Sequence, residues 1–194
     1  MPEGQLGEGA PIFVIEISLR EKIEKAFAHR QMPTEVVEPE EFLQFDSDVE
    51  EALWFAGRDW HEITREDWRS HNCAVTFLSP EALAYYLPSL LTLTVENPKE
   101  YPDLAVDSLI NELDRTPCVD GWDDHFRSRF LGLRPEEYDV MKAWLLFMCE
   151  NFTNYSCGAA ASGPGETFGR AFDTIDLLQE ETRNPAKSQV NMFL

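Results

Sequence analysis

The stretch Ser79-Pro-Glu-Ala-Leu-Ala-Tyr-Tyr-Leu-Pro-Ser-Leu-Leu-Thr-Leu-Thr-Val95 decides the fold, because it contains an uncharged, largely apolar run of 14 residues. Ser79 is a favourable N-cap residue, and Pro80 suits the first helical position, where its missing N–H is not needed. Leucine residues then recur at helical spacing along a run that is apolar on nearly all sides. The stretch therefore predicts a buried, central helix.

Pro88 interrupts this predicted helix. Proline cannot donate a backbone hydrogen bond, and its ring presses on the preceding turn. We therefore expect either a kink, which makes this a Pro-kinked apolar helix, or two helices that meet at Leu87 and Pro88. The uncharged run, residues 82–95, is too short to cross a bilayer.

Helical periodicity also dominates the rest of the chain. Apolar residues spaced by three and four predict helices near residues 15–28, 47–56, 103–113 and 166–180, and another from Pro135. Thr64 and Asp67 have the spacing of an N-cap and its N3 residue for a short turn, and residues 124–131 fit a short helix. No alternating pattern of useful length indicates a strand. We predict an all-α fold, a single compact domain of five to seven helices over residues 11–184, with loosely ordered termini at 1–10 and 185–194.

The composition is strongly acidic. The 194 residues include 36 acidic and 16 basic ones, which gives a net charge of -20. Such a surface repels phosphate backbones and anionic membranes, so we expect neither nucleic acid nor membrane as a partner. It attracts a basic protein partner, although the same charge can also serve only to keep the protein dissolved.

The acidic residues are concentrated in one segment. No basic residue occurs between Gln31 and Gly57. The candidate partner-binding residues there are Glu38, Glu40, Glu41, Asp46, Asp48, Glu50 and Glu51. A solvated surface accounts for this pattern, and so does a contact face for a basic protein. The favoured hypothesis is an acidic, non-enzymatic interaction protein; in its sharpest form it is an immunity- or inhibitor-type protein that occludes a basic toxin or nuclease.

A second cluster supports an alternative hypothesis. Asp120, Asp123, Asp124 and His125 place three carboxylates and an imidazole within six residues. They could hold a metal ion, or a general base and the group that orients it. Turn chemistry at Asp-Gly and a helix cap account for the same residues. A metal-dependent enzyme or metal-binding protein is therefore the alternative, while the favoured hypothesis includes no cofactor.

No order of catalytic residues is recognisable. The four histidines, at positions 29, 61, 71 and 125, are scattered and follow no known nucleophile pattern. The four cysteines match neither a zinc motif nor a disulfide framework. We therefore expect free thiols in a reducing cytoplasm, and the N-terminal residues lack the basic region of a signal peptide.

Two aromatic motifs carry a family resemblance. Phe55, Gly57 and Trp60 fit the pattern F-x-G-x-x-W, and residues 77–88 fit F-L-S/T-P-x-A-x-x-Y-Y-L-P. Together they resemble a family of small, uncharacterised bacterial proteins, a domain of unknown function, which implies no particular activity.

The aromatic residues of these motifs allow two interpretations. Buried aromatic side chains usually pack in a core, with any hydroxyl group bonded to the protein. Alternatively, Trp60, Tyr85 and Tyr86 line a groove for a small ligand. A small-ligand module is thus a third hypothesis.

Overall fold

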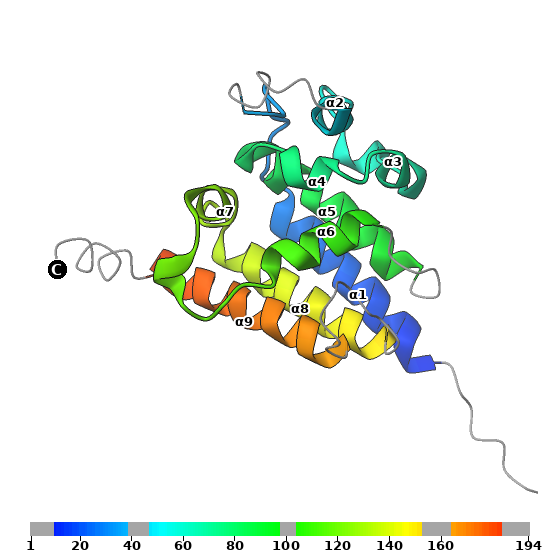
Figure 1. The fold of residues 1–194 in the computed structure, drawn as a ribbon. Coiled ribbons are helices and arrows are strands. Elements are labelled where there is room, and N and C mark those ends of the chain that lie inside the picture. Colours follow the sequence, from blue (N-terminus) through cyan, green and yellow to red (C-terminus); the bar gives the residue numbers. More distant parts are fainter. Residues whose placement is uncertain (1–9, 39–46, 98–103, 153–163, 184–194) are drawn as a thin grey trace, which may run out of the picture.

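A computed structural model describes residues 10–38, 47–97, 104–152 and 164–183, and all regular elements among them are helical (Figure 1). The longer α-helices are α1 (Ala10–Phe27), α5 (Pro80–Glu96), α6 (Leu104–Leu113), α8 (Pro135–Asn151) and α9 (Pro164–Arg183). The shorter elements are α2 (Ser47–Leu53), α3 (Arg65–Ser70), α4 (Ala74–Phe77), α7 (Asp124–Phe130) and the 3-10 helices η2 (Trp60–Glu62) and η3 (Val119–Gly121).

The all-α prediction is confirmed, but the predicted count of five to seven helices is too low for the described residues, which form nine α-helices. The difference lies in the short elements. The α4 helix has four residues and no side-chain cap at Cys73, so neither periodicity nor capping chemistry marks it in the sequence. The predicted loose termini fall outside the described residues, apart from Ala10, at which α1 begins.

Two helix starts carry the caps that the sequence indicates. Thr64 and Asp67 form a reciprocal capping box at the start of α3. The Ser79 hydroxyl accepts a hydrogen bond from the N–H of Ala82, and Pro80 is the first residue of α5. Gly57 has a φ of 72°, the left-handed conformation that glycine adopts without strain, although α2 already ends at Leu53.

The central helix does not break at Pro88. The α5 helix continues from Pro80 to Glu96, so the prediction of two helices meeting at Leu87 and Pro88 is wrong. Side-chain hydroxyls add hydrogen bonds around the proline: Ser89 donates to the carbonyl of Tyr86 at 2.7 Å, and Thr92 donates to that of Pro88 at 2.8 Å. The helix is also buried on nearly all sides, so packing favours one continuous helix through a residue that cannot donate.

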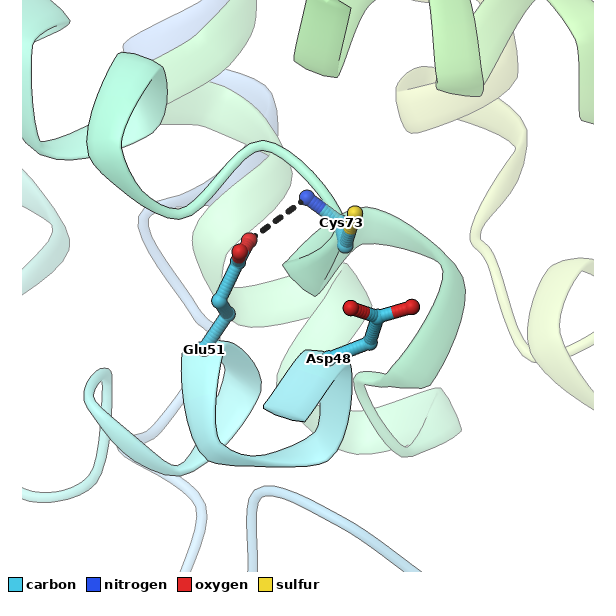
Figure 2. A group of neighbouring side chains, drawn as sticks. All are labelled: Asp48, Glu51 and Cys73. Carbon is cyan, nitrogen blue, oxygen red and sulfur yellow. Dashed lines mark hydrogen bonds between the residues drawn. The ribbon is translucent and has the colours of Figure 1, made fainter. Parts of the chain in front are cut away.

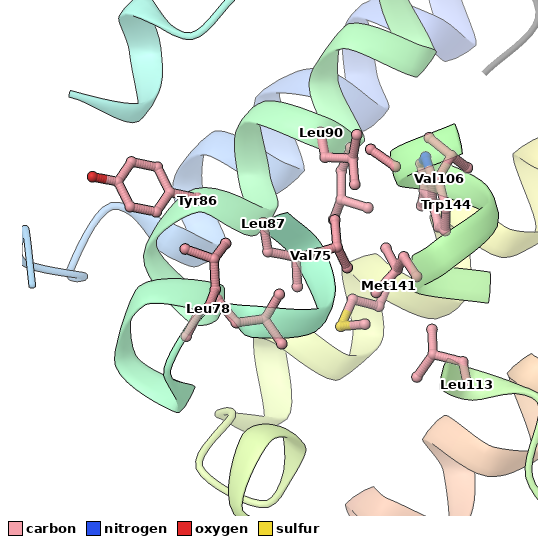
Figure 3. Close-up of a cluster of buried hydrophobic side chains, with 14 of the residues drawn as sticks. Val75, Leu78, Tyr86, Leu87, Leu90, Val106, Leu113, Met141 and Trp144 are labelled. Carbon is pink, nitrogen blue, oxygen red and sulfur yellow. The ribbon is translucent and has the colours of Figure 1, made fainter. Parts of the chain in front are cut away.

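The other helices surround α5 and share one core. The α1 helix packs against α5 and α8, and α9 packs against α8 and α6. Figure 3 shows where apolar side chains of α4, α5, α6 and α8 meet, including Val75, Leu87, Leu90, Val106 and Met141. Trp144 of α8 joins this cluster, and its indole N–H donates to the hydroxyl of Thr94 at 2.6 Å. No helix among the described residues combines the length and the apolar character needed to cross a membrane.

A buried ion pair connects α8 to the end of α1. Glu137 is fully buried, and both of its carboxylate oxygens accept from the guanidinium of Arg30, with Nε to Oε1 at 2.6 Å. The N–H of Arg134 donates to Oε2 at 2.6 Å, and His29 Nε2 lies 3.6 Å from Oε1. The carboxylate is therefore compensated in a place that water does not reach.

The Glu137 pair makes a clear prediction for stability. Glu137→Ala leaves the Arg30 guanidinium without its carboxylate, so the free energy of unfolding should fall by about 3 kcal/mol. The matched control is Glu136→Ala, because Glu136 is the exposed neighbour and such changes usually stay within about 0.5 kcal/mol. Urea unfolding of both variants measures the difference, and equal losses would contradict a stabilising role for the buried pair.

Candidate functional site

The predicted acidic segment is described in part. Glu40, Glu41 and Asp46 lie outside the described residues. Of the others, Glu50 is exposed, and Glu38, Asp48 and Glu51 are half-buried. Val49 and Ala52 turn the apolar side of α2 towards the core, whereas Glu50 faces solvent.

One carboxylate of α2 has a structural role. Glu51 Oε2 accepts a hydrogen bond from the N–H of Cys73 at 2.9 Å, as Figure 2 shows. Cys73 has no side-chain cap of its own at the start of α4. Glu51 therefore satisfies a backbone donor at that helix start and connects α2 to α4.

Among the described residues, one group of side chains could hold a metal ion: Asp48, Glu51 and Cys73. One ligand atom from each side chain lies within 4.8 Å of the other two. Exposed acidic groups often lie this close without an ion, and one oxygen of Glu51 already accepts from Cys73. Sequence reasoning did not find this group, because Cys73 is 22 residues from Glu51 and no ligand spacing marks the three residues.

The predicted metal cluster does not converge in the described structure. Asp123 is the N-cap of α7, where its Oδ1 accepts from the N–H of Phe126 at 2.7 Å. That hydrogen bond, together with the charge of Arg115, lowers the pKa of Asp123. Asp120, Asp124 and His125 are exposed. The helix-cap interpretation accounts for Asp123, and metal binding by the four residues stays a prediction.

The three predicted groove residues are buried. The exposed fractions of Trp60, Tyr85 and Tyr86 are 6%, 5% and 0%. The hydroxyl of Tyr86 lies within hydrogen-bond distance of the carbonyl oxygens of Phe55 and Arg58, and its ring contacts the Phe55 ring edge-on at 5.1 Å. This contact joins the two aromatic motifs, because residues 55–60 and 77–88 meet there. A small-ligand groove stays a prediction, without exposed ring surface to support it.

A surface between α8 and α9 was not anticipated from the sequence. An open groove of about 290 Å³ is lined by Leu145, Leu146, Cys149, Phe168, Gly169, Phe172 and Asp173. Leu146, which lines the groove, is 55% exposed. In the sequence, this surface is indicated by Leu146, which falls on the same side of α8 as the exposed residues Asp139 and Glu150.

Sulfur chemistry gives no separate site among the described residues. Cys73, Cys118 and Cys149 are free thiols, and Cys157 lies outside the described part of the chain. Cys149 belongs to the wall of the α8–α9 groove. The described structure thus presents two candidate surfaces: the acidic one at α2 and the groove between α8 and α9.

Burial of two tyrosines predicts a pH dependence of stability. Burial raises the pKa of Tyr86 to about 12, and that of Tyr138 also to about 12. Both phenols are protonated in either state below pH about 10. Between pH about 10 and about 12 the unfolded chain loses protons that the folded protein keeps, so the free energy of unfolding should fall as the pH rises. Urea unfolding across this range measures the slope.

Tyr86→Phe is the control for this prediction. It removes one of the two titrating phenols, so the decline with pH should be shallower than in the wild-type protein, whatever the variant's stability at neutral pH. Equal slopes in the two proteins would show that the Tyr86 phenol is not protected from ionisation in the folded state.

Comparison with known proteins identifies a family without a function. No curated protein and no solved structure matches the chain. A family model described as a family of unknown function (DUF6714) matches residues 16–156, a span that contains both aromatic motifs. This span is more than half of the chain, and the protein therefore belongs to the family of unknown function DUF6714.

Proposed function

We propose that this protein is a non-enzymatic binding protein for a basic protein partner, and that the acidic segment 38–51 forms its contact face. The observation that carries the proposal is the absence of any basic residue between Gln31 and Gly57, in a chain with a net charge of -20. In the described part of the segment Glu50 is exposed, while Val49 and Ala52 pack inward.

The use of basic residues inside the fold supports the proposal. Many described basic side chains are already paired with carboxylates of the same chain, namely Arg20, Arg30, Arg69, Arg115, Arg127, Arg129, Lys142 and Arg170. Intramolecular pairs neutralise these cations locally. The excess negative charge therefore remains on surface carboxylates, where it is available to another molecule.

A basic protein is the partner that such a surface favours. Complementary potentials speed the encounter of two proteins and suppress partners of like charge. Nucleic acids and anionic membranes are repelled by the same surface. An immunity- or inhibitor-type protein that occludes a basic toxin or nuclease is the narrower form of the proposal, and the identity of the partner decides it.

Affinity capture tests the proposal. The immobilised protein is exposed to native lysate, and the retained proteins are identified by mass spectrometry at low and at high salt. We expect a defined basic protein that is retained at low salt and lost at about 0.5 M salt, because screening weakens exposed charge pairs. Retention of nothing, or only of partners indifferent to salt, would contradict the proposal.

Charge reversal locates the contact face. A variant with Lys in place of Glu38, Glu40, Glu41, Asp46 and Glu50 should lose the partner; Glu51 is kept because it caps α4. The matched control reverses five carboxylates elsewhere, namely Glu21, Glu62, Glu81, Asp120 and Asp124, all of which are exposed. Both variants have the same net charge, so equal loss of binding would show that the segment is not a specific face.

A further inference from the structure

The groove between α8 and α9 is a second surface, separate from the acidic segment. The two helices run antiparallel, because Lys142 of α8 binds Asp176 at 3.0 Å and Tyr138, one turn earlier, lies 3.2 Å from Thr182. Their C-terminal and N-terminal halves, respectively, form the groove. Figure 1 shows α2 and α9 at opposite sides of the molecule.

The floor and walls of the groove are apolar. Leu145 and Phe168 are buried beneath it, and Leu146 and Phe172 stand at its sides. Gly169 contributes no side chain, and a Cβ atom placed on it would meet nothing within 4 Å. The groove has a volume of about 290 Å³, which is at or below the lower limit of roughly 300 Å³ for small-molecule sites. The groove fits a few apolar side chains better than a whole cofactor.

The exposed sides of the two helices that form the groove are rich in carboxylates, and one of them, Asp173, lines the groove. The exposed acidic residues of the two helices are Glu136, Asp139 and Glu150 on α8, and Glu166, Asp173, Asp176 and Glu180 on α9. Within each helix they recur at spacings of three, four or seven, or their sums, which places them along one side.

The nearby cations are already engaged. Lys142 binds Asp176 and also donates to Gln179 at 2.7 Å. Arg170 is shared between Glu166 and Asp114. No described cation forms an ion pair with Asp173, which lines the groove, or with Glu150, one turn after Leu146, so this rim of the groove remains negative.

We propose that the α8–α9 groove binds a basic amphipathic helix of a partner protein. Apolar side chains of that helix enter between Leu146 and Phe172, and its Lys or Arg residues reach Glu150 and Asp173. This is the helix-in-groove mode of recognition, in which side chains one turn apart provide the anchors.

The charge of the rim decides between the occupants. A second copy of this chain would bring another net charge of -20 to a negative rim, and an anionic membrane would be repelled as well. A helix with an apolar side and a basic side places the apolar side against the floor of the groove and the basic side against its negative rim. The proposal does not depend on the acidic segment 38–51, since it rests on other residues.

A model peptide provides the probe. We use a fluorescent peptide of about 14 residues, roughly four helical turns, made of Leu and Lys with helical periodicity. One control peptide has the same composition in scrambled order, and the other has Glu in place of Lys. Fluorescence anisotropy at 0.15 M salt should show saturable binding of the amphipathic basic peptide, and binding at least about tenfold weaker for both controls.

Variants at Gly169 test the apolar groove itself. Gly169→Leu places a side chain into the open space and should weaken binding of the basic peptide about tenfold. Gly169→Ala is the matched control: it makes the same backbone change, leaves most of the groove open, and should keep the wild-type affinity. Circular dichroism and thermal unfolding verify that both variants remain folded.

Variants of the rim test the charge requirement. The double variant Glu150→Lys and Asp173→Lys should weaken the basic peptide about tenfold. Its control is Glu21→Lys with Glu81→Lys, which changes the net charge equally at exposed residues outside the groove. The five-residue reversal of segment 38–51 should reduce affinity no more than its own matched control, which separates this proposal from the proposed function.

Several results would overturn the proposal. One is a failure of the basic peptide to bind saturably, and another is equal binding of the scrambled peptide. A third is wild-type affinity for the basic peptide in folded Gly169→Leu. Equal loss of peptide affinity in the rim variant and in its control would show that only the net charge matters, and this result would overturn the proposal too.

Discussion

The structure depends on the burial of α5, because a helix enclosed on nearly all sides must satisfy its polar groups without water. The hydroxyl of Ser89 donates to the backbone carbonyl of Tyr86, one turn earlier. Indole groups of other helices complete the pattern: Trp68 of α3 donates to Ser89, and Trp144 of α8 donates to Thr94. The polar groups of α5 thus help to determine where its neighbours pack.

Ion pairs within the fold determine which charges remain on the surface. Arg129 is buried and binds Glu112 and the carbonyl of Val75, and Arg30 binds the buried Glu137. These cations cannot be removed without leaving a buried carboxylate or carbonyl group uncompensated. Because the chain has far more acidic than basic residues, the fold uses many of its cations internally and leaves an outer surface of carboxylates. Both proposed contact surfaces follow from this division.

Features that depend on neighbouring residues could be predicted from the sequence, and those that depend on distant contacts could not. The capping box of Thr64 and Asp67 and the start of α5 at Ser79 need only a few adjacent residues. The unbroken helix at Pro88 could not be predicted, because the burial of α5 depends on residues that are distant in the sequence. The contact of Glu51 with Cys73 depends on the packing of α2 against α4.

The two candidate surfaces also differ in how far they could be predicted from the sequence. The acidic segment is visible as a run of residues, whereas the groove depends on the antiparallel register that places residues 145–149 beside 168–173. For the aromatic motifs, the interpretation as core packing could be made from the sequence, and the burial of Tyr86 agrees with it. Tyr86 connects the two motifs through the carbonyl groups of Phe55 and Arg58, which is a structural role in the core.

Hydrogen–deuterium exchange on this protein, with and without the basic partner retained in affinity capture, tests the central claim most directly. The claim is that the outward carboxylates of a closed helical core form the contact surface for another protein. It predicts slower amide exchange at residues 38–53, along the groove at 145–149 and 168–173, or at both. Protection confined to the Asp120–His125 cluster, or to the buried motif around Tyr86, would contradict it.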